Sequence, residues 1–211
     1  HLTETRGFDV IPRMLEAFAE DRTTAEVFQD VLDLDLADYD RQFREFVGRI
    51  VGDYKMVPRW DRETVAALEK RVKEDETDGE AWVRLGWARL QRGVAIDAGG
   101  ALAKALTLIP DHPDVVLLQG RLAELNGRLD LAAEAYERFL GLGEDDLHAR
   151  LFLAGRIMQR GDDTAAAIPH LEAAKACFPY QTGKQSPYVI LAKLYRGSGE
   201  MEKAIAELEA Y

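Results

Sequence analysis

Residues 79–110 read GEAWVRLGWARLQRGVAIDAGGALAKALTLIP, and the spacing of their small residues returns three more times along the chain. Each copy has a glycine followed five or six residues later by an alanine: Gly93 and Ala98, Gly127 and Ala132, Gly161 and Ala167, and Gly199 and Ala204. Successive alanines are 34, 35 and 37 residues apart, the period of a repeated helix-turn-helix unit. The sequence therefore predicts an all-α solenoid of stacked helix pairs.

The same residues resemble the tetratricopeptide (TPR) family. In the first helix of its repeat, the family has a bulky aromatic residue, then Leu-Gly, and then a glycine that closes the helix. The second helix has a small residue, a bulky residue and an alanine, and a proline ends it. These positions are filled, in chain order, by Trp82, Leu85, Gly86, Gly93, Ala98, Leu102, Ala105 and Pro110. Gly86 and Ala98 leave room for two helices to approach closely, and Gly93 tolerates the positive φ that ends a helix. The resemblance implies a right-handed TPR-type helix-turn-helix solenoid.

We expect the TPR-like array to span residues 61–211. Its parts are a half-repeat at 61–76, full repeats at 79–112, 113–146 and 147–179, and a truncated repeat at 185–211 that follows an insertion around residues 181–186. The end repeats of a solenoid must hide an apolar face, so we expect the half-repeat to cover the first full repeat. Arg150 takes the place of the first bulky residue of the third full repeat, which predicts a loosely packed or wet corner.

The last repeat carries Tyr188, Leu191, Leu208 and Tyr211, and no polar capping helix follows it. Two interpretations stay open: the parent chain continues, or a partner packs there. A second copy of this chain is one such partner, which predicts self-association through the uncapped end.

Residues 1–60 lack the repeat and form a predicted helical N-terminal region. Apolar residues at helical spacing predict helices near residues 10–18, at Thr24–Leu32 and at Leu36–Tyr54. Val57–Trp60 is a predicted linker, because Pro58 interrupts the helical pattern.

The Gly7-Phe8-Asp9 start and the phrase LDLADYDRQF at residues 34–43 give residues 1–55 a second resemblance. They are similar to the helical tail of gluzincin-type, peptidase-MA-like metallopeptidase domains. The resemblance implies that this chain is the tail of a truncated upstream domain, whose zinc-binding His-Glu-x-x-His helix lies before His1. That motif does not occur in the chain itself.

Composition excludes several classes of partner. Lys plus Arg number 27 against 38 Asp plus Glu, a formal net charge of −11, whereas a general nucleic-acid binder needs the opposite sign. No apolar run approaches the roughly 20 residues of a membrane span, so we expect no membrane insertion. The single Cys177 rules out an intramolecular disulfide framework. The compartment stays undecided between cytoplasmic and extracytoplasmic.

The sequence predicts no catalytic, cofactor-binding or metal-binding site. No two of the four histidines have the i, i+4 spacing of a zinc pair. Cys177 has no evident His-Asn or His-Asp partner, and no phosphate-binding glycine loop occurs. The acidic run from Asp33 has Ala37 at the fifth position and Asp38 at the sixth, which an EF-hand loop does not allow. We therefore expect this fragment not to be an enzyme.

The TPR resemblance implies a concave face, lined by the first helix of each pair, that binds an extended peptide or a partner helix. The positions that correspond to this face are Val83, Trp87, Leu90, Leu117, Arg121, Glu124, Leu151, Gly155, Met158, Val189, Lys193 and Arg196. The family's carboxylate clamp is absent, because apolar residues and His148 occupy its basic and asparagine positions. The apolar positions have two interpretations: they bury side chains of a partner, or they pack inside this chain.

Two hypotheses of function follow. The first is a non-catalytic interaction module that binds a protein or peptide through the concave face, with Trp87 as an apolar anchor and Arg121, Lys193 and Arg196 orienting acidic groups. The second is the C-terminal helical part of a larger zinc metallopeptidase-like protein, whose catalytic residues lie upstream.

Overall fold

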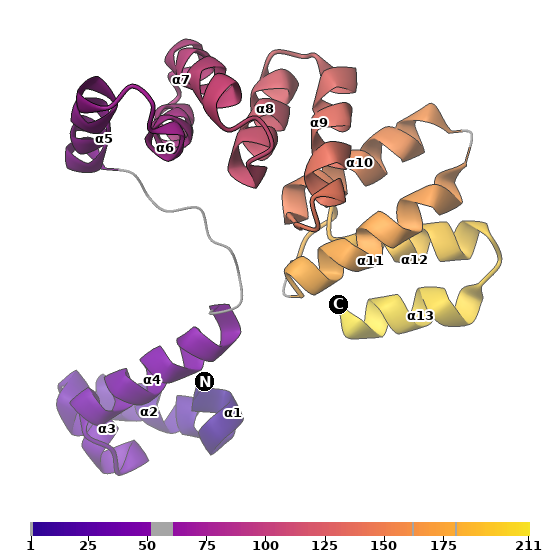
Figure 1. Ribbon diagram of the computed structural model, residues 1–211. Helices are drawn as coiled ribbons and strands as arrows, with labels where there is room; N and C mark the ends of the chain where they lie inside the picture. The colour runs from indigo at the N-terminus through magenta and orange to yellow at the C-terminus, as the bar shows by residue number, and fades with distance from the viewer. Residues whose placement is uncertain (1, 52–60, 162, 180) are drawn as a thin grey trace. The chain divides into compact units, whose positions relative to one another are not determined.

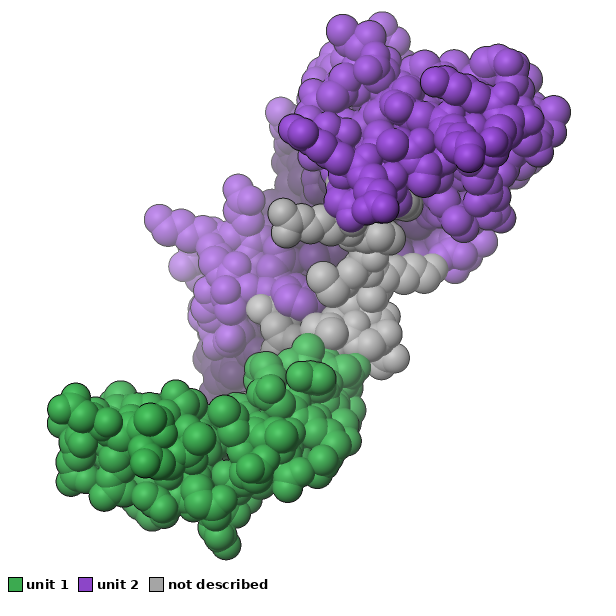
Figure 2. All heavy atoms as spheres, turned by 90° about the vertical axis from the view of Figure 1, so that its left-hand side faces the viewer, with its two compact units in different colours: residues 1–57 green, residues 58–211 purple. Residues whose placement is uncertain are grey.

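The computed structural model describes residues 2–51, 61–161, 163–179 and 181–211, and the regular structure within these ranges is helical throughout (Figure 1). The chain divides into two compact units, residues 1–57 and residues 58–211 (Figure 2). The predicted linker Val57–Trp60 lies outside the described residues, as do residues 52–54 at the end of the helix predicted to reach Tyr54.

Within residues 2–51, the described part of the first unit, there are four helices. They are α1 (Leu2–Arg6), α2 (Val10–Ala19), α3 (Thr24–Leu32) and α4 (Leu36–Val51). Thr23 begins α3 with a capping box, in which its hydroxyl accepts from the backbone N–H of Glu26 and the Glu26 carboxylate accepts from the backbone N–H of Thr23. The core forms between α2 and α3, and the Tyr39 ring of α4 meets Phe28 edge-on at 4.7 Å between ring centroids.

The second unit contains nine α-helices within the described residues. They are α5 (Arg62–Glu74), α6 (Gly79–Gln91), α7 (Ala95–Leu108), α8 (Pro113–Leu125), α9 (Leu129–Gly141), α10 (Leu147–Arg160), α11 (Ile168–Cys177), α12 (Pro187–Gly197) and α13 (Met201–Ala210), with a short 3-10 helix, Thr164–Ala167, before α11. Each α-helix packs against the next one along the chain, and α6 also contacts α8. The predicted all-α solenoid is confirmed.

Small residues set the distance between the helices of the second unit. The glycines at the turns within the four pairs, Gly93, Gly127, Gly161 and Gly199, all have φ between +70° and +83°, a region that other residues rarely adopt. Gly120 of α8 lies under the ring of Tyr136, where an added Cβ would meet a ring carbon at 2.5 Å. A larger side chain there would push α9 away from α8.

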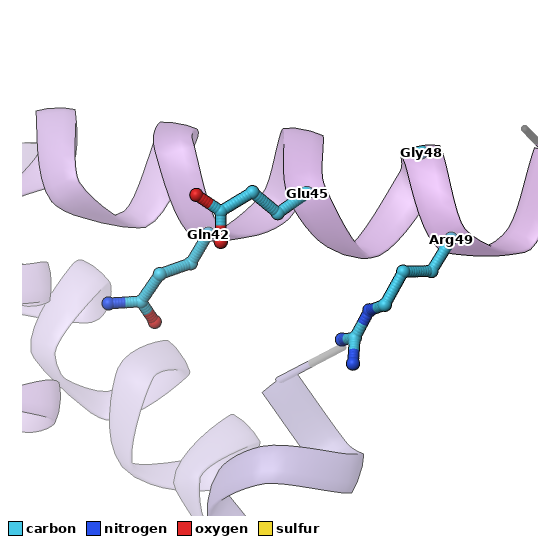
Figure 3. Close-up of a pocket in the computed structure, with 4 residues that line it drawn as sticks. All are labelled: Gln42, Glu45, Gly48 and Arg49. Carbon is cyan, nitrogen blue, oxygen red and sulfur yellow. The ribbon is translucent and has the colours of Figure 1, made fainter.

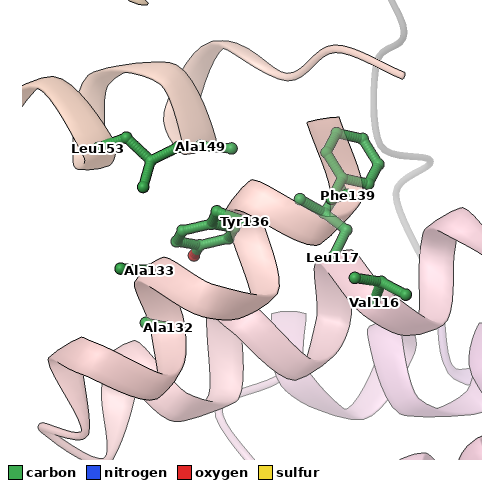
Figure 4. Packing of buried hydrophobic residues seen from close by; sticks show 8 residues of the cluster. All are labelled: Val116, Leu117, Ala132, Ala133, Tyr136, Phe139, Ala149 and Leu153. Carbon is green, nitrogen blue, oxygen red and sulfur yellow. The ribbon is translucent and has the colours of Figure 1, made fainter. Parts of the chain in front are cut away.

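The core of the second unit runs through its centre as a series of clusters. In the middle cluster the fully buried Tyr136 of α9 points toward Ala149 and Leu153 of α10, and Val116 of α8 belongs to the same cluster (Figure 4). At the N-terminal end Val65, Leu68 and Val72 of α5 pack against buried residues of α6 and α7. This helix therefore covers the apolar side of the first full pair.

The apolar residues of the last repeat differ in exposure. Tyr188 and Leu191 of α12 are buried at 8% and 0% exposure, whereas Leu208 of α13 and the terminal Tyr211 are at least half exposed. The apolar surface expected at the C-terminal end is thus confined to α13 and the residue after it.

An ion pair occupies the Arg150 position of the third full repeat, where loose or wet packing was predicted. The guanidinium of Arg150 donates to the Asp145 carboxylate through Nε at 2.8 Å and Nη2 at 3.1 Å. Burial would raise the pKa of Asp145, but the hydrogen bonds and charge of Arg150 outweigh it and hold the pKa below its usual value. A half-buried ion pair thus occupies the position of the aromatic side chain.

Candidate functional site

The candidate site is the surface formed by the first helix of each pair, α6, α8, α10 and α12, which we call the first-helix face. Val83 and Leu117 were predicted to line it, but they are only 2% and 8% exposed. Val83 packs in a cluster with Leu102 and Leu118, and Leu117 packs beside Tyr136. Because both side chains turn toward the core, they join neighbouring helices instead of meeting a partner.

Trp87 and Leu90 of α6 lie at the edge of the core and are half-buried. The indole N–H of Trp87 donates to the backbone carbonyl of Asp114 in α8 at 3.1 Å, and its ring packs against two of the buried clusters. Trp87 therefore ties α6 to α8, which favours the interpretation that it packs inside this chain.

Glu124 and Arg121 of α8 already face charged or polar partners within the chain. Glu124 accepts hydrogen bonds from the Tyr136 hydroxyl at 2.8 Å and from Nε2 of His148 at 2.7 Å. Burial, and next the hydrogen bond to Glu124, raise the pKa of Tyr136 well above its usual value, so the phenol stays protonated and donates. Arg121 lies 3.9 Å from the Asp146 carboxylate. These groups link α8 and α9 to the start of α10.

A hollow of about 410 Å³ opens at the α10–α12 end of the first-helix face. Leu151 and Met158 of α10, two of the residues predicted for the concave face, and Ile190 of α12 form its apolar lining. Further lining residues are Ala154, Gly155, Gln159, Leu171, Gln181 and Gln185. Val189, the predicted residue on α12, is half-buried but is not part of this lining.

The helix that contributes Ile190 to the hollow, α12, also carries two cations that are unpaired among the described residues. Lys193 and Arg196 of α12 are exposed, and neither forms an ion pair with another described residue. The four helices of the first-helix face carry eight basic and three acidic residues, a net charge of +5, in a chain whose net charge is −11. Ion pairs within the chain already occupy the other six basic residues of these helices, so the unpaired positive charge among the described residues of this face is that of Lys193 and Arg196.

A second hollow, along α4 in the first unit, is a weaker candidate. Gln42, Glu45, Gly48 and Arg49 line it (Figure 3). All four residues are exposed and belong to one helix. Among the described residues it therefore has no second wall to hold a ligand.

Neither a metal-binding cluster nor an activated cysteine is present within the described residues. No three His, Cys, Asp or Glu side chains there gather in a way that could hold a metal ion. Burial, and next the charge of Asp145, raise the pKa of Cys177 to about 11, which keeps it an unreactive thiol at neutral pH. Burial, and next the Arg150 charge, lower the pKa of His170. No described helix has both the length and the apolar character needed to cross a bilayer.

Comparison with known proteins identifies the fold. No family model matches the chain, and no curated protein is similar in sequence. Among solved structures, MamA has a TM-score of 0.54 at 20% identity over 84% of this chain and 92% of its own. YrrB, a TPR protein with an unusual peptide-binding site, has a TM-score of 0.51 at 17% identity over 93% of this chain and 89% of its own.

A third similar structure is the Cut9–Hcn1 hetero-tetramer of APC/C. It has a TM-score of 0.51 at 16% identity, and it covers 99% of this chain but 37% of its own. The TM-scores show a shared fold, and at identities of 16–20% the similarity does not identify a ligand for this chain. The chain has a tetratricopeptide-repeat fold.

Proposed function

We propose that residues 61–211 form a non-catalytic interaction module, which binds an acidic protein or peptide segment at the α10–α12 end of the first-helix face. One observation carries this proposal: Lys193 and Arg196 are exposed cations that no described acidic residue neutralises, although the chain as a whole is strongly acidic. The peptide-binding site of YrrB, a protein with a similar fold, agrees with it.

The free lysine and arginine suggest how such a partner is recognised. Their charges attract an acidic segment over a distance of about 10 Å at 0.1 M salt and less at higher salt. Elsewhere on the face Arg84 is paired with Glu80, and Arg156 with Asp130. We therefore expect these other cations to contribute less to binding than the α12 pair.

The charge-reversed variant Lys193→Glu/Arg196→Glu tests the proposal. We would select peptides from a displayed random library on the full chain and measure a synthetic peptide of the selected sequence by fluorescence anisotropy. We expect acidic peptides to be enriched, and the double variant to bind at least about tenfold more weakly, since every 1.4 kcal/mol is tenfold. Added salt should weaken binding to the wild-type chain.

The matched control is Lys70→Glu/Lys73→Glu on α5, which makes the same change in net charge away from the first-helix face. Both lysines are exposed, so we expect the fold and the affinity to stay near those of the wild type. Equal affinities for the two double variants, or a library that yields no binder, would remove the proposal.

A second candidate concerns the first unit. Phe8 is 71% exposed, and Leu15 of α2 is 63% exposed on the side away from Met14 and the unit's core. This exposed apolar surface favours the role of a helical tail that packs against a metallopeptidase-like domain of a longer protein. Sequencing the gene upstream of the His1 codon tests it: a His-Glu-x-x-His helix and stoichiometric zinc in the longer product are expected, and their absence would rule the candidate out.

A further inference from the structure

The hollow between α10 and α12 has a shape that the repeat alone does not provide. Its floor consists of Ala154 and Leu171, which are buried at 1% and 0% exposure. Gly155 stands at its edge on α10 between Leu151 and Met158, and an added Cβ there would meet nothing within 4 Å. The missing side chain of Gly155 therefore leaves open space beside the apolar walls.

The remaining wall comes from the loop between α11 and α12, which the chain inserts into the repeat. Gln181 and Gln185 of this loop line the hollow. The Oε1 atom of Gln181 is buried and has no hydrogen-bond partner among the described residues. A buried acceptor without a donor is unfavourable, and a ligand N–H would relieve it once the Gln181 side chain turns its Oε1 atom into the hollow.

The geometry points to an extended segment of a partner, with one large apolar side chain seated in the hollow and one backbone N–H donated to Gln181 Oε1. This inference rests on the proposed function and names the subsite that would select its ligand. The volume of about 410 Å³ lies at the small end of the roughly 300–1,000 Å³ typical of ligand pockets. It suits an anchor side chain better than a broad protein surface.

The orphan acceptor favours an extended over a helical occupant, if the donor is a backbone N–H. Within a helix the backbone N–H groups beyond the first turn are already bonded to carbonyls of the same helix. An extended segment has free N–H groups along its length. A second copy of this chain would bring the exposed apolar side of α13, and its N–H groups beyond the first turn are used in this way.

Charge near the hollow sets a further requirement for the segment. Lys193 lies one helical turn beyond Ile190 and so on the same side of α12. An acidic residue next to the apolar anchor would meet this cation. We therefore expect the selected peptides to share a large aliphatic or aromatic residue with an acidic residue close to it.

The variant Gly155→Leu tests the pocket, because its Cβ would meet nothing within 4 Å and its side chain adds apolar volume at the edge of the hollow. We expect a selected peptide to bind this variant at least about tenfold more weakly than the wild type, and to bind Gly155→Ala within about twofold. Replacing the anchor residue of the peptide by alanine should weaken binding to the wild type and have little further effect on Gly155→Leu. Unchanged affinity for Gly155→Leu, with the far-ultraviolet circular dichroism preserved, would overturn the inference.

A second measurement leaves the protein unchanged, so it holds even where a variant fails to fold. Single N-methylation along the peptide removes one backbone donor at a time, and we expect one position, next to the anchor, to lose affinity for the wild type while Gln181→Ala is insensitive to it. Equal effects on both proteins would contradict the role of Gln181.

The outcomes separate this inference from the proposed function. A peptide that is sensitive to Lys193→Glu/Arg196→Glu but indifferent to Gly155→Leu would refute the pocket and leave the module standing. A wild-type chain that binds no library peptide would refute the module. A dimer in sedimentation that Gly155→Leu dissociates would show that a second copy occupies the hollow, which contradicts an extended peptide.

Discussion

Tyr136→Ala is expected to lower the free energy of unfolding of the array by about 3–5 kcal/mol, the usual effect of removing a large buried aromatic side chain. Tyr136 has no exposed surface and joins α8, α9 and α10 in one cluster. Its ring also meets Phe152 edge-on at 5.1 Å. Urea unfolding followed by circular dichroism measures the loss, and a change below about 1 kcal/mol would show that this cluster does not hold the pairs together.

Tyr136→Phe is the matched control for this variant. It keeps the ring and removes only the hydroxyl that donates to Glu124. Glu124 retains its contact with His148, so we expect a loss of about 1 kcal/mol. The difference between the two variants separates the packing of the ring from its hydrogen bond.

Lys175→Met should destabilise the C-terminal pair by about 3–5 kcal/mol, because it leaves a buried carboxylate without its cation. Lys175 of α11 donates to both oxygens of Glu207 in α13, at 2.8 and 2.9 Å, and also contacts Glu172. The side chain of Glu207 is 11% exposed. Denaturant unfolding of the variant, observed by circular dichroism, measures the effect.

Two further variants identify the cause. Lys203→Met removes an exposed lysine from the same helix pair and should change stability by less than about 0.5 kcal/mol. Lys175→Met/Glu207→Leu removes both buried charges and should recover most of the loss. A double variant as unstable as the single one would mean that packing of the lysine stem, and not the unpaired carboxylate, causes the loss.

The same ion pair predicts a dependence on pH. Burial would lower the pKa of Lys175, but the hydrogen bonds and charges of Glu207 and Glu172 outweigh it and raise the pKa. The folded state thus holds this proton more tightly than the unfolded state does. The contribution to stability is therefore complete below the usual lysine pKa of about 10.4 and is lost as pH rises through the raised value.

Local signals explain why the fold was predictable from the sequence. A glycine at each turn and an alanine at each close helix contact are properties of short segments, and they place the pairs α6–α7 to α12–α13 without knowledge of the tertiary structure. The direction in which a side chain points depends on its position around the helix axis, and each residue turns that direction by about 100°. This is why Val83 and Leu117 turned out to lie in the core, and why Ile190 rather than its neighbour Val189 lines the hollow.

Other features of the site have no counterpart in the repeat pattern. Gln181 and Gln185 come from an inserted loop, so no repeat position predicts where they lie. The pairing of Arg150 with Asp145 depends on a turn that brings the carboxylate back over the helix. In both cases the contact depends on how a loop or turn folds back on a helix, which the repeat pattern does not specify.

Sequential packing of the helices in the second unit has a kinetic consequence. Since each helix meets the next one in the chain, most stabilising contacts close short loops, and short loops form fast. Folding can begin at any pair and spread to its neighbours. The array can thus gain structure pair by pair during synthesis, before its C-terminal helices have left the ribosome.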